Sequence, residues 1–413
     1  MSAPPPASRL LQRTLMVLGI ALFSLQATDA MRGVWRNQRA SDFATYHYAA
    51  QVAWSGGDPY TTRALSQAAR ADGTRKSVHP FFYPPPFLLG MLWDRGLSLS
   101  TAYRCWGIAN LLALLASVAV LRRWLKAPWW LLAIVAGTLT PAFNAIKMGQ
   151  ANQLVLLPAL VGLWLGRGSW VAGAAMAKMS PVLFLAGWAP RRLWRPVLGA
   201  VLTAVLLSVI ALSIVPFDTQ MRFYLDIMPG FSSGEYHGLR VPITLPANHS
   251  IPDLFHQLWP GPDNHHLHPR SAMASKIVSL SLLGGLTWVA TQVRRQDVMA
   301  EVGLAGALTV LMVITPVYAY EHHLAWLVLP GTAAGMALYT GRLSPRWGWV
   351  AGPAWALSVV HLAWARSLRD AAPAPLDWVV QESKFAGLIG LMVVCVAAAL
   401  SKDSHDSAAA STG

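Results

Sequence analysis

The chain has 413 residues, of which 54% are hydrophobic and only 12% are charged, about half the ~25% charged residues of a typical soluble domain. Its mean hydropathy is +0.42 and it contains 19 tryptophans. These values exclude a soluble globular domain, a disordered chain, a coiled coil and a collagen. They predict an all-α polytopic membrane protein, since a helix satisfies its own backbone hydrogen bonds inside a bilayer.

The net charge is +14, from 32 basic and 18 acidic residues. In a soluble protein this charge would suggest nucleic-acid binding. Here the basic residues gather in short loops beside apolar runs, as they do on the cytoplasmic side of membrane proteins. We therefore expect membrane lipids as partners and no nucleic acid.

The first apolar run covers residues 15–27 and follows Arg9 and Arg13. It resembles a signal peptide, but the apolar chain that follows favours a retained first span that starts in the cytoplasm. A polar stretch, residues 28–79, should then form a first extracytoplasmic loop. Within it, segments 42–54 and 62–71 have helical spacing with aromatic residues on one side, and we expect amphipathic helices that lie flat in the membrane interface.

A second polar loop at residues 218–270 divides the apolar runs that follow. Before it lie the runs 81–93, 102–121, 129–146, 154–165, 170–188 and 197–217, and after it lie 277–293, 302–317, 324–338, 347–364 and 385–400. A span needs about 20 apolar residues. We expect about 12 transmembrane helices in a single membrane domain of residues 1–400. Residues 401–413 should form a disordered cytoplasmic tail.

Basic residues orient the second half of the chain. The rule that cytoplasmic loops are positive places these residues inside: Arg191, Arg192, Arg195, Arg294, Arg295, Arg342 and Arg346. The second loop and the turn at residues 318–323 are then outside, together with the first loop.

The middle of the chain allows two topologies. If run 81–93 crosses the membrane, Arg122, Arg123 and Lys126 lie outside, against the charge rule. If that run only enters the membrane, the basic loop is inside and residues 172–188 form a re-entrant hairpin with Lys178 near its outer tip. The sequence leaves both topologies open.

Asp42 begins the segment Ser41-Asp42-Phe43-Ala44-Thr45-Tyr46-His47-Tyr48 just after the first span. An acid at the membrane surface among aromatic side chains suits a general base that faces a sugar hydroxyl. The alternative is structural, because Ser41 or Asp42 could cap the helix that follows.

Lys178 stands in the middle of an apolar run. A charge at that depth costs about 2.5–3.5 kcal/mol on insertion scales, so it should line a polar cavity or bind an anion such as a phosphate. The alternative is a lysine that reaches the interface from a short helix end.

Three other segments carry polar groups with two interpretations each. The amides of Gln150 and Asn152 could bind a sugar or link helices. The turn Tyr318-Ala319-Tyr320-Glu321-His322-His323 could offer imidazoles to a phosphate, or be a polar turn with interfacial tyrosines. The cluster of His265, His266 and His268 with Asp263 lacks the spacing of a common zinc site and is expected to be a solvated loop.

In chain order, several segments resemble glycosyltransferase family 87, a GT-C-type family that uses polyprenyl-phosphate sugars and includes mycobacterial phosphatidylinositol-mannoside mannosyltransferases. The matching pieces are Ser41-Asp42-Phe43 with Tyr46 and Tyr48, Gly57-Asp58-Pro59-Tyr60, Tyr83-Pro84-Pro85, Gly149-Gln150-Ala151-Asn152, Lys178 with Pro181, Asn248-His249-Ser250, and Thr315-Pro316 with His322-His323. The family's small-polar-residue–Pro–aromatic motif reads Thr315-Pro316-Val317-Tyr318 here, which departs from the pattern.

The resemblance implies a GT-C bundle in the cell membrane with an extracytoplasmic active site. It implies transfer of a hexose, mannose by default, from polyprenyl phosphate to a glycolipid or glycan, with inversion and without a metal or cofactor. Asp42 would be the base. Donor phosphate would be bound by Lys178, His322, His323 and Tyr83, and substrate by Tyr46, Tyr60, Gln150, Asn152 and Asn248.

Two other classes share the composition. A transporter or lipid flippase would also carry a buried lysine, but should show internal repeats or paired broken helices. A polysaccharide polymerase or ligase would have one dominant late outer loop. The discriminating observation is whether Asp42, Lys178 and His322 reach one outer cavity.

Overall fold

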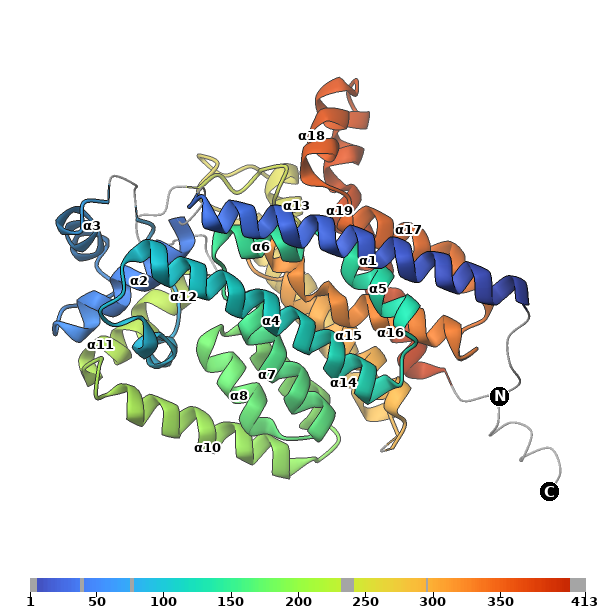
Figure 1. Cartoon of the computed structure of the whole chain (residues 1–413), viewed down its shortest axis with the longest axis horizontal. Helices are drawn as coiled ribbons and strands as arrows, with labels where there is room; N and C mark the ends of the chain where they lie inside the picture. Colours follow the sequence, from blue (N-terminus) through green and yellow to red (C-terminus); the bar gives the residue numbers. More distant parts are fainter. Residues whose placement is uncertain (1–5, 38–40, 75–77, 232–240, 295, 402–413) are drawn as a thin grey trace.

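The computed structural model describes residues 6–37, 41–74, 78–231, 241–294 and 296–401, and within these ranges the chain is all-α, with no strand. Most helices run along the long axis of the molecule, and α18 (Leu362–Ala371) projects from it (Figure 1). Of the predicted tail, residues 401–413, all but Ser401 lie outside the described residues.

Among the described residues, five helices are long and apolar enough to cross a membrane: α1 (Pro6–Trp35), α4 (Leu99–Leu125), α10 (Trp194–Ala211), α14 (Pro269–Gln292) and α19 (Leu376–Leu400). A sixth is formed if α5 (Trp129–Thr138) and α6 (Thr140–Met148) count as one span bent by 53°. The bend lies where Pro141 removes a backbone donor at the start of α6.

The expected count of about 12 spans is therefore not confirmed. Two apolar helices are shorter than a full span, α7 (Asn152–Leu165) and α15 (Val298–Ile314). The remaining expected runs near the C-terminus are broken into η4 (Glu321–Leu327), α16 (Val328–Tyr339), η5 (Pro345–Trp347) and α17 (Gly348–Val359).

The first loop differs from expectation in two ways. α1 continues past residue 28 to Trp35, and Asp29 near its end pairs with Lys147 of α6. α2 (Ser41–Trp54) and α3 (Thr62–Ala71) match the expected segments. However, α2 is not an amphipathic helix with one exposed face, because residues 43–50 are buried on every side and pack on α3, α4 and η1 (Pro85–Asp94).

The run at 81–93 does not form a spanning helix. Its only regular element is the 3-10 helix η1, ten residues long, which rises about 20 Å against the ~30 Å of a bilayer core. Pro84, Pro85 and Pro86 open it, and they cannot donate the hydrogen bonds of a longer helix. This geometry agrees with the topology in which the run only enters the membrane.

Residues 168–188 form the hairpin that this topology requires. α8 (Gly168–Ala177) ends at Lys178, and η2 (Ser180–Phe184) and α9 (Leu185–Trp188) lead the chain back. The start of α8 touches the start of α10, since a Cβ on Gly168 would lie 1.7 Å from the Pro196 carbonyl oxygen. Lys178 is thus at the tip of a helix–break–helix hairpin.

Basic residues of several loops meet at one end of the bundle. Arg123, at the end of α4, lies over the Trp164 ring at the end of α7. Arg191 pairs with Glu301 at the start of α15 at 2.8 Å, and Arg342 pairs with Asp297 at the same helix end at 2.7 Å. Trp164 lies four residues before the start of α8, which touches α10 at Pro196, five residues after Arg191. The basic loop at 122–126 therefore lies at the same end as the later basic loops.

Within its described residues, 218–231 and 241–270, the second loop contains two helical segments. The first is continuous through α11 (Phe217–Arg222), η3 (Phe223–Ile227) and α12 (Met228–Gly230), and Arg222 pairs with Asp58 of the first loop. The second is α13 (Ile251–Leu258), capped by Ser250 and packed on α14. The two loops thus cover the same end of the bundle, opposite the basic end.

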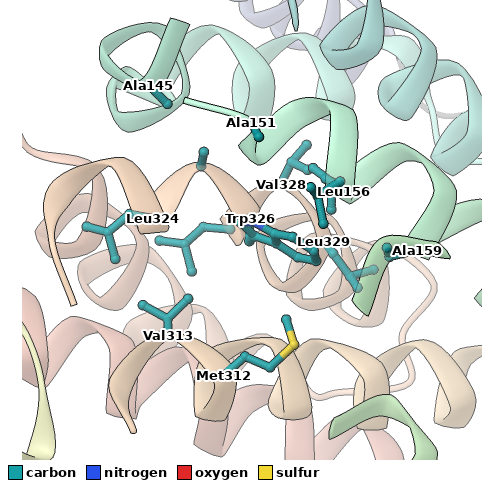
Figure 2. Packing of buried hydrophobic residues seen from close by; sticks show 14 of the residues in the cluster. Ala145, Ala151, Leu156, Ala159, Met312, Val313, Leu324, Trp326, Val328 and Leu329 are labelled. Atoms are coloured by element: carbon teal, nitrogen blue, oxygen red, sulfur yellow. The ribbon is translucent and has the colours of Figure 1, made fainter. Parts of the chain in front are cut away.

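The core beneath these loops is apolar and tightly packed. Figure 2 shows Trp326, Val328 and Leu329 between α15 on one side and the start of α7 on the other. α6 and α7 present small side chains there, Ala145, Ala151 and Ala159, so the segment that contains η4 can approach them closely. This packing sets the position of the turn that precedes η4.

Candidate active site

A cavity of about 960 Å³ lies between the loops and the helix ends opposite the basic end. Its wall is made by α2, the segment before η1, the α6–α7 junction, the tip of the α8 hairpin, α12, one face of α14 and the turn at residues 318–323, whose last three residues begin η4. We call residues 318–323 the histidine turn. The candidate residues that line it are Asp42, Tyr46, Tyr83, Gln150, Lys178, His322 and His323. The structure thus gathers at one cavity seven residues from five separate segments.

Asp42 lies in the first turn of α2 and faces the cavity. Its carboxylate accepts a hydrogen bond from Gln150 Nε2 at 2.8 Å, which is a tertiary contact and not the contact of a helix cap. The side chain of Ser41, the alternative cap, lies outside the described part. Burial raises the pKa of Asp42 above its ordinary value, although the Gln150 bond and the charges of His79 and Lys178 oppose this.

Gln150 reaches Asp42 because of the glycine before it. Gly149 ends α6 with φ +76°, a conformation that favours glycine. A Cβ at Gly149 would also lie 2.6 Å from the Phe43 Cβ, so the close contact between α2 and this loop requires a glycine at position 149. Trp106 Nε1 donates to the Gly149 carbonyl oxygen at 2.9 Å and fixes the loop.

Two tyrosines extend the polar wall beside Asp42. The hydroxyls of Tyr46 and Tyr83 lie 2.6 Å apart, where one donates to the other, and they lie 3.3 and 3.2 Å from Gln150 Oε1, which the remaining hydroxyl proton can reach. Tyr60 does not line the cavity. Its hydroxyl donates to the Tyr83 carbonyl oxygen at 2.9 Å and supports the segment behind that ring.

Lys178 is connected to the histidine turn through Asn152. Lys178 Nζ donates to Asn152 Oδ1 at 2.5 Å, and Asn152 Nδ2 donates to the His322 carbonyl oxygen at 2.6 Å. Asn152 is fully buried and lies behind the cavity wall. The lysine therefore lines the cavity, where Asn152 supplies its polar partner, and does not reach out to an interface. Asn152 also fixes the position of Lys178 Nζ relative to the His322 backbone.

The two histidines face the cavity as neutral rings. Burial and the nearby Lys178 hold the pKa values of His322 and His323 well below 6.5. Their ring centroids lie 4.3 Å apart in an edge-to-face arrangement. A neutral imidazole can donate one hydrogen bond to an anion, so a positive charge on this side of the cavity has to come from Lys178. Burial lowers the pKa of Lys178 to about 7, although the Asp42 carboxylate acts to raise it.

Asn248 lies behind the turn and does not line the cavity. Its side chain donates to the Val317 carbonyl oxygen at 2.9 Å and accepts from the Ala319 backbone at 2.8 Å. It therefore holds the backbone of the turn, as Tyr60 and Asn152 hold other parts of the wall.

Two basic residues that line the cavity were not among the candidates chosen from the sequence, His79 and Lys276. His79 lies close enough to Asp42 for its charge to act on that carboxylate. Lys276 lines the cavity from α14 and is exposed at its rim. No sequence pattern near His79 indicates that it faces the cavity. The only such indication for Lys276 is that it is a basic residue at the edge of an apolar run.

The histidine-rich loop is separate from the cavity. His266 Nδ1 lies 2.9 Å from Asp263 Oδ1, and both side chains are about half exposed. Among the described residues, no three His, Cys, Asp or Glu side chains are grouped closely enough to hold a metal ion.

A family model described as glycosyltransferase family 87 matches residues 81–316, more than half of the chain. The chain belongs to glycosyltransferase family 87. The matched region contains Tyr83, Gln150 and Lys178, whereas Asp42 and His322 lie on either side of it. No curated protein and no solved structure matches this glycosyltransferase, so the GT-C arrangement stays a prediction.

Membership makes the protein a transferase of sugars, and the cavity of this glycosyltransferase has the groups that such a reaction needs. A carboxylate can take a proton from a hydroxyl. A lysine and a hydrogen-bond donor on the facing wall can bind an anionic leaving group. Aromatic and amide groups between them can contact a sugar.

Proposed function

We propose that the protein transfers a hexose, mannose by default, from a polyprenyl-phosphate donor to a glycolipid or glycan acceptor. The reaction would take place on the extracytoplasmic side of the cell membrane. The observation that carries the proposal is the meeting of Asp42, Lys178 and His322 at one cavity. A base and a phosphate-binding cation in one cavity suit a sugar that leaves from a phosphate.

The surroundings of the cavity favour a donor with a lipid tail. α14 lines it with Ala272, Ser275, Lys276, Ser279 and Leu280, the spacing of one helix face. Exposed apolar side chains continue from this face across the rim, at Val182, Met228 and Leu280. A polyprenyl chain could lie on this rim beside a membrane-spanning helix, with its phosphate between Lys276 and Lys178.

In the proposed reaction, Asp42 takes the proton of an acceptor hydroxyl. The acceptor oxygen bonds to the anomeric carbon from the face opposite the phosphate, which inverts the configuration. The bond from that carbon to the phosphate oxygen breaks, and polyprenyl phosphate leaves with the electron pair. Its charge rises from about −1 to −2, and Lys178 and the His322 ring stabilise the added charge.

The proposal involves no metal ion or cofactor, because phosphate is already a good leaving group and lysine supplies the opposing charge. Tyr46, Tyr83 and Gln150 would contact the sugar or the donor phosphate. Tyr60, Asn152 and Asn248 would act from behind the wall, through the residues that they hold.

The pH dependence of transfer should follow Asp42. Because its pKa is raised, the base is lost as the pH falls through a value above the usual ~3.9 of aspartate. Gln150→Leu removes a hydrogen bond that lowers this pKa, so the acid limb of kcat/KM should move to higher pH. Gln153→Leu is the matched control, since Gln153 is a buried amide bonded to the Ala142 carbonyl oxygen. An unchanged acid limb in Gln150→Leu would remove Asp42 as the titrating base.

The orientation predicts opposite labelling of the two ends. In a variant without Cys105 and Cys395, Ser55→Cys after α2 should react with a membrane-impermeant maleimide on intact cells. Gln292→Cys, at the end of α14 beside the basic loop, should react only after permeabilisation. Labelling of both positions from one side would contradict the orientation.

The proposed function is tested by incubating membranes that contain the protein with a panel of radiolabelled polyprenyl-phosphate sugars and nucleotide sugars. We expect the label to reach a new product from a polyprenyl-phosphate sugar, with mannose tested first. Transfer from nucleotide sugars alone would refute the proposed donor class. Movement of the intact donor without transfer would indicate a transporter.

A further inference from the structure

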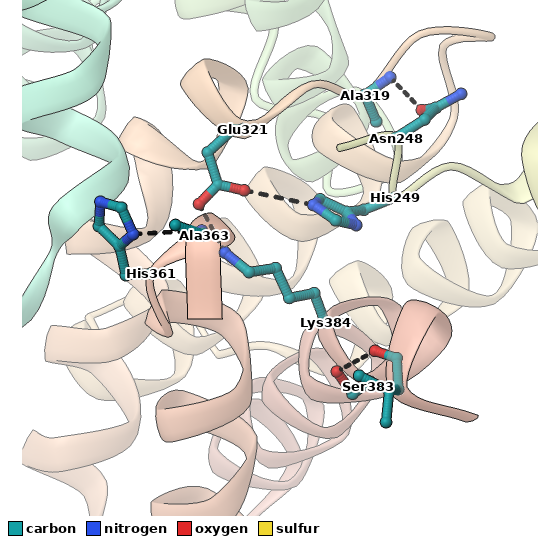
Figure 3. Close-up of polar contacts among 9 residues, drawn as sticks. Asn248, His249, Ala319, Glu321, His361, Ala363, Ser383 and Lys384 are labelled. Atoms are coloured by element: carbon teal, nitrogen blue, oxygen red, sulfur yellow. Dashed lines mark hydrogen bonds and ion pairs between the residues drawn. The ribbon is translucent and has the colours of Figure 1, made fainter. Parts of the chain in front are cut away.

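A buried ion cluster lies behind the histidine turn and does not touch the cavity. Lys384 Nζ of α19 is 2.5 Å from Glu321 Oε1, and His249 Nε2 is 3.3 Å from Glu321 Oε2 (Figure 3). The side chains of Lys384 and His249 are each 1% exposed and that of Glu321 is 8% exposed. We call these three residues the Glu321 cluster.

The cluster and the cavity are on opposite sides of the same short segment. Tyr320, His322 and His323 line the cavity, whereas Glu321 between them faces α19. Glu321 is therefore one residue from His322 but is directed toward Lys384. The cluster can affect a substrate in the cavity only through the position of this turn.

The second loop holds the same turn from another direction. The His249 backbone donates to the Ala319 carbonyl oxygen at 3.1 Å, and Ser250 Oγ donates to the Val317 carbonyl oxygen at 3.0 Å. His249 thus binds the turn twice, by its backbone and by its ring. The cluster links three parts of the chain, the second loop, the histidine turn and α19, that are far apart in sequence.

The charges in the cluster balance. Burial alone raises the pKa of Glu321, but the hydrogen bond from His249 and the charge of Lys384 outweigh it and hold the pKa below its ordinary value. The carboxylate is therefore ionised and compensated. A buried pair of this kind adds little stability over apolar residues of similar size, and its best-attested role is to fix one arrangement of the chain.

We propose that Glu321 and Lys384 are positioning residues for sugar transfer, which hold His322 against the leaving phosphate by locking the turn to α19. The inference rests on the proposed function and deepens it. A positioning role explains why Lys384 is buried in α19, eight residues after the start of this membrane-spanning helix, although a lone charge there would be costly. The other described contacts to the turn on that side come from the second loop, through the side chains of Asn248 and Ser250 and the His249 backbone.

The test uses a double variant, Glu321→Gln with Lys384→Met, so that no unpaired charge is left in the core. A displacement of about 1 Å in a group that meets the transition state can cost up to about 100-fold in rate. We expect kcat to fall by about 10- to 100-fold. KM for the donor should change by less than about threefold, since an interaction used mainly in the transition state affects kcat more than binding.

The matched control is the double variant Arg342→Gln with Asp297→Asn. This pair also joins separate helices, at 2.7 Å with the arginine side chain 2% exposed, but it lies at the basic end of the bundle. Its removal should leave kcat per folded molecule near the wild-type value. A second readout needs no substrate: hydrogen exchange of the peptide at 317–323 should rise in the Glu321 double variant and stay unchanged in the control.

A wild-type kcat in the Glu321 double variant, or unchanged exchange in residues 317–323, would overturn the positioning role. An equal loss of kcat in the control would also overturn it, since the effect would then be general. If the wild-type protein uses no polyprenyl-phosphate donor, the proposed function fails, and the exchange comparison still decides whether the cluster holds the turn.

Discussion

Asp42→Asn is expected to lower kcat by about 10²- to 10⁴-fold, the range that general-base catalysis contributes. The amide oxygen can still accept the hydrogen bond from Gln150 Nε2, so the wall of the cavity should keep its shape. Asparagine also serves at a helix start about as well as aspartate. The variant should insert, melt near the wild-type temperature and bind donor, because only the ability to take a proton is lost.

Asp58→Asn is the matched control for this experiment. Asp58 is another acid of the first loop with a tertiary partner, since it pairs with Arg222 of the second loop, and it lies outside the cavity wall. It should keep most of the activity. If Asp42→Asn turned over at more than about half the wild-type rate, its carboxylate could not be the base, given the size of general-base effects.

Lys178→Met is expected to have the second largest effect, and that effect should appear in donor binding as well as in rate. A charge-assisted hydrogen bond to phosphate contributes about 1.5–3 kcal/mol, which corresponds to about 10- to 150-fold in donor affinity. The variant also loses the cation that opposes the charge of the leaving phosphate. Donor affinity can be measured with a non-transferable polyprenyl-phosphate sugar analogue.

Lys147→Met controls for the loss of a lysine from the same region. Lys147 ends α6 and pairs with Asp29 of α1, away from the cavity, so its removal should leave donor affinity near wild type. Unchanged affinity in Lys178→Met would show that this lysine does not contact the donor phosphate.

Local pattern was enough to predict several elements. The segments 42–54 and 62–71 were predicted from helical spacing and correspond to α2 and α3. Lys178 was selected because a lone charge in an apolar run needs a polar environment, and it does line the cavity. In both cases the deciding information lies within a few residues of the feature.

Other features depend on contacts that no local pattern contains. The polar composition of the first loop suggested surface helices, but α2 is buried because α3, α4 and η1 cover it. Hydropathy could not decide the topology at 81–93, where three prolines give a short 3-10 helix in an apolar run. Lys384, which directly precedes the run at 385–400, was not singled out from the sequence, because its burial arises only when Glu321 meets it from another segment.

In the candidate site too, some features could be predicted from the sequence and others depend on tertiary contacts. The sequence and the family resemblance named seven residues that line the cavity. They also named Tyr60, Asn152 and Asn248, which the structure places behind its wall. Whether a polar side chain faces a cavity or supports its wall depends on the packing of both partners, so a motif alone cannot separate these roles.

The most direct test of the proposed transfer is a double-label experiment with purified protein in liposomes. The donor carries ¹⁴C in the sugar and ³²P in the polyprenyl phosphate, and acceptor lipids are supplied. We predict that ¹⁴C moves to the acceptor with inverted anomeric configuration, ³²P stays with the polyprenyl lipid, and Asp42→Asn abolishes the separation of the two labels. Movement of both labels together, or across the membrane without separation, would contradict the account.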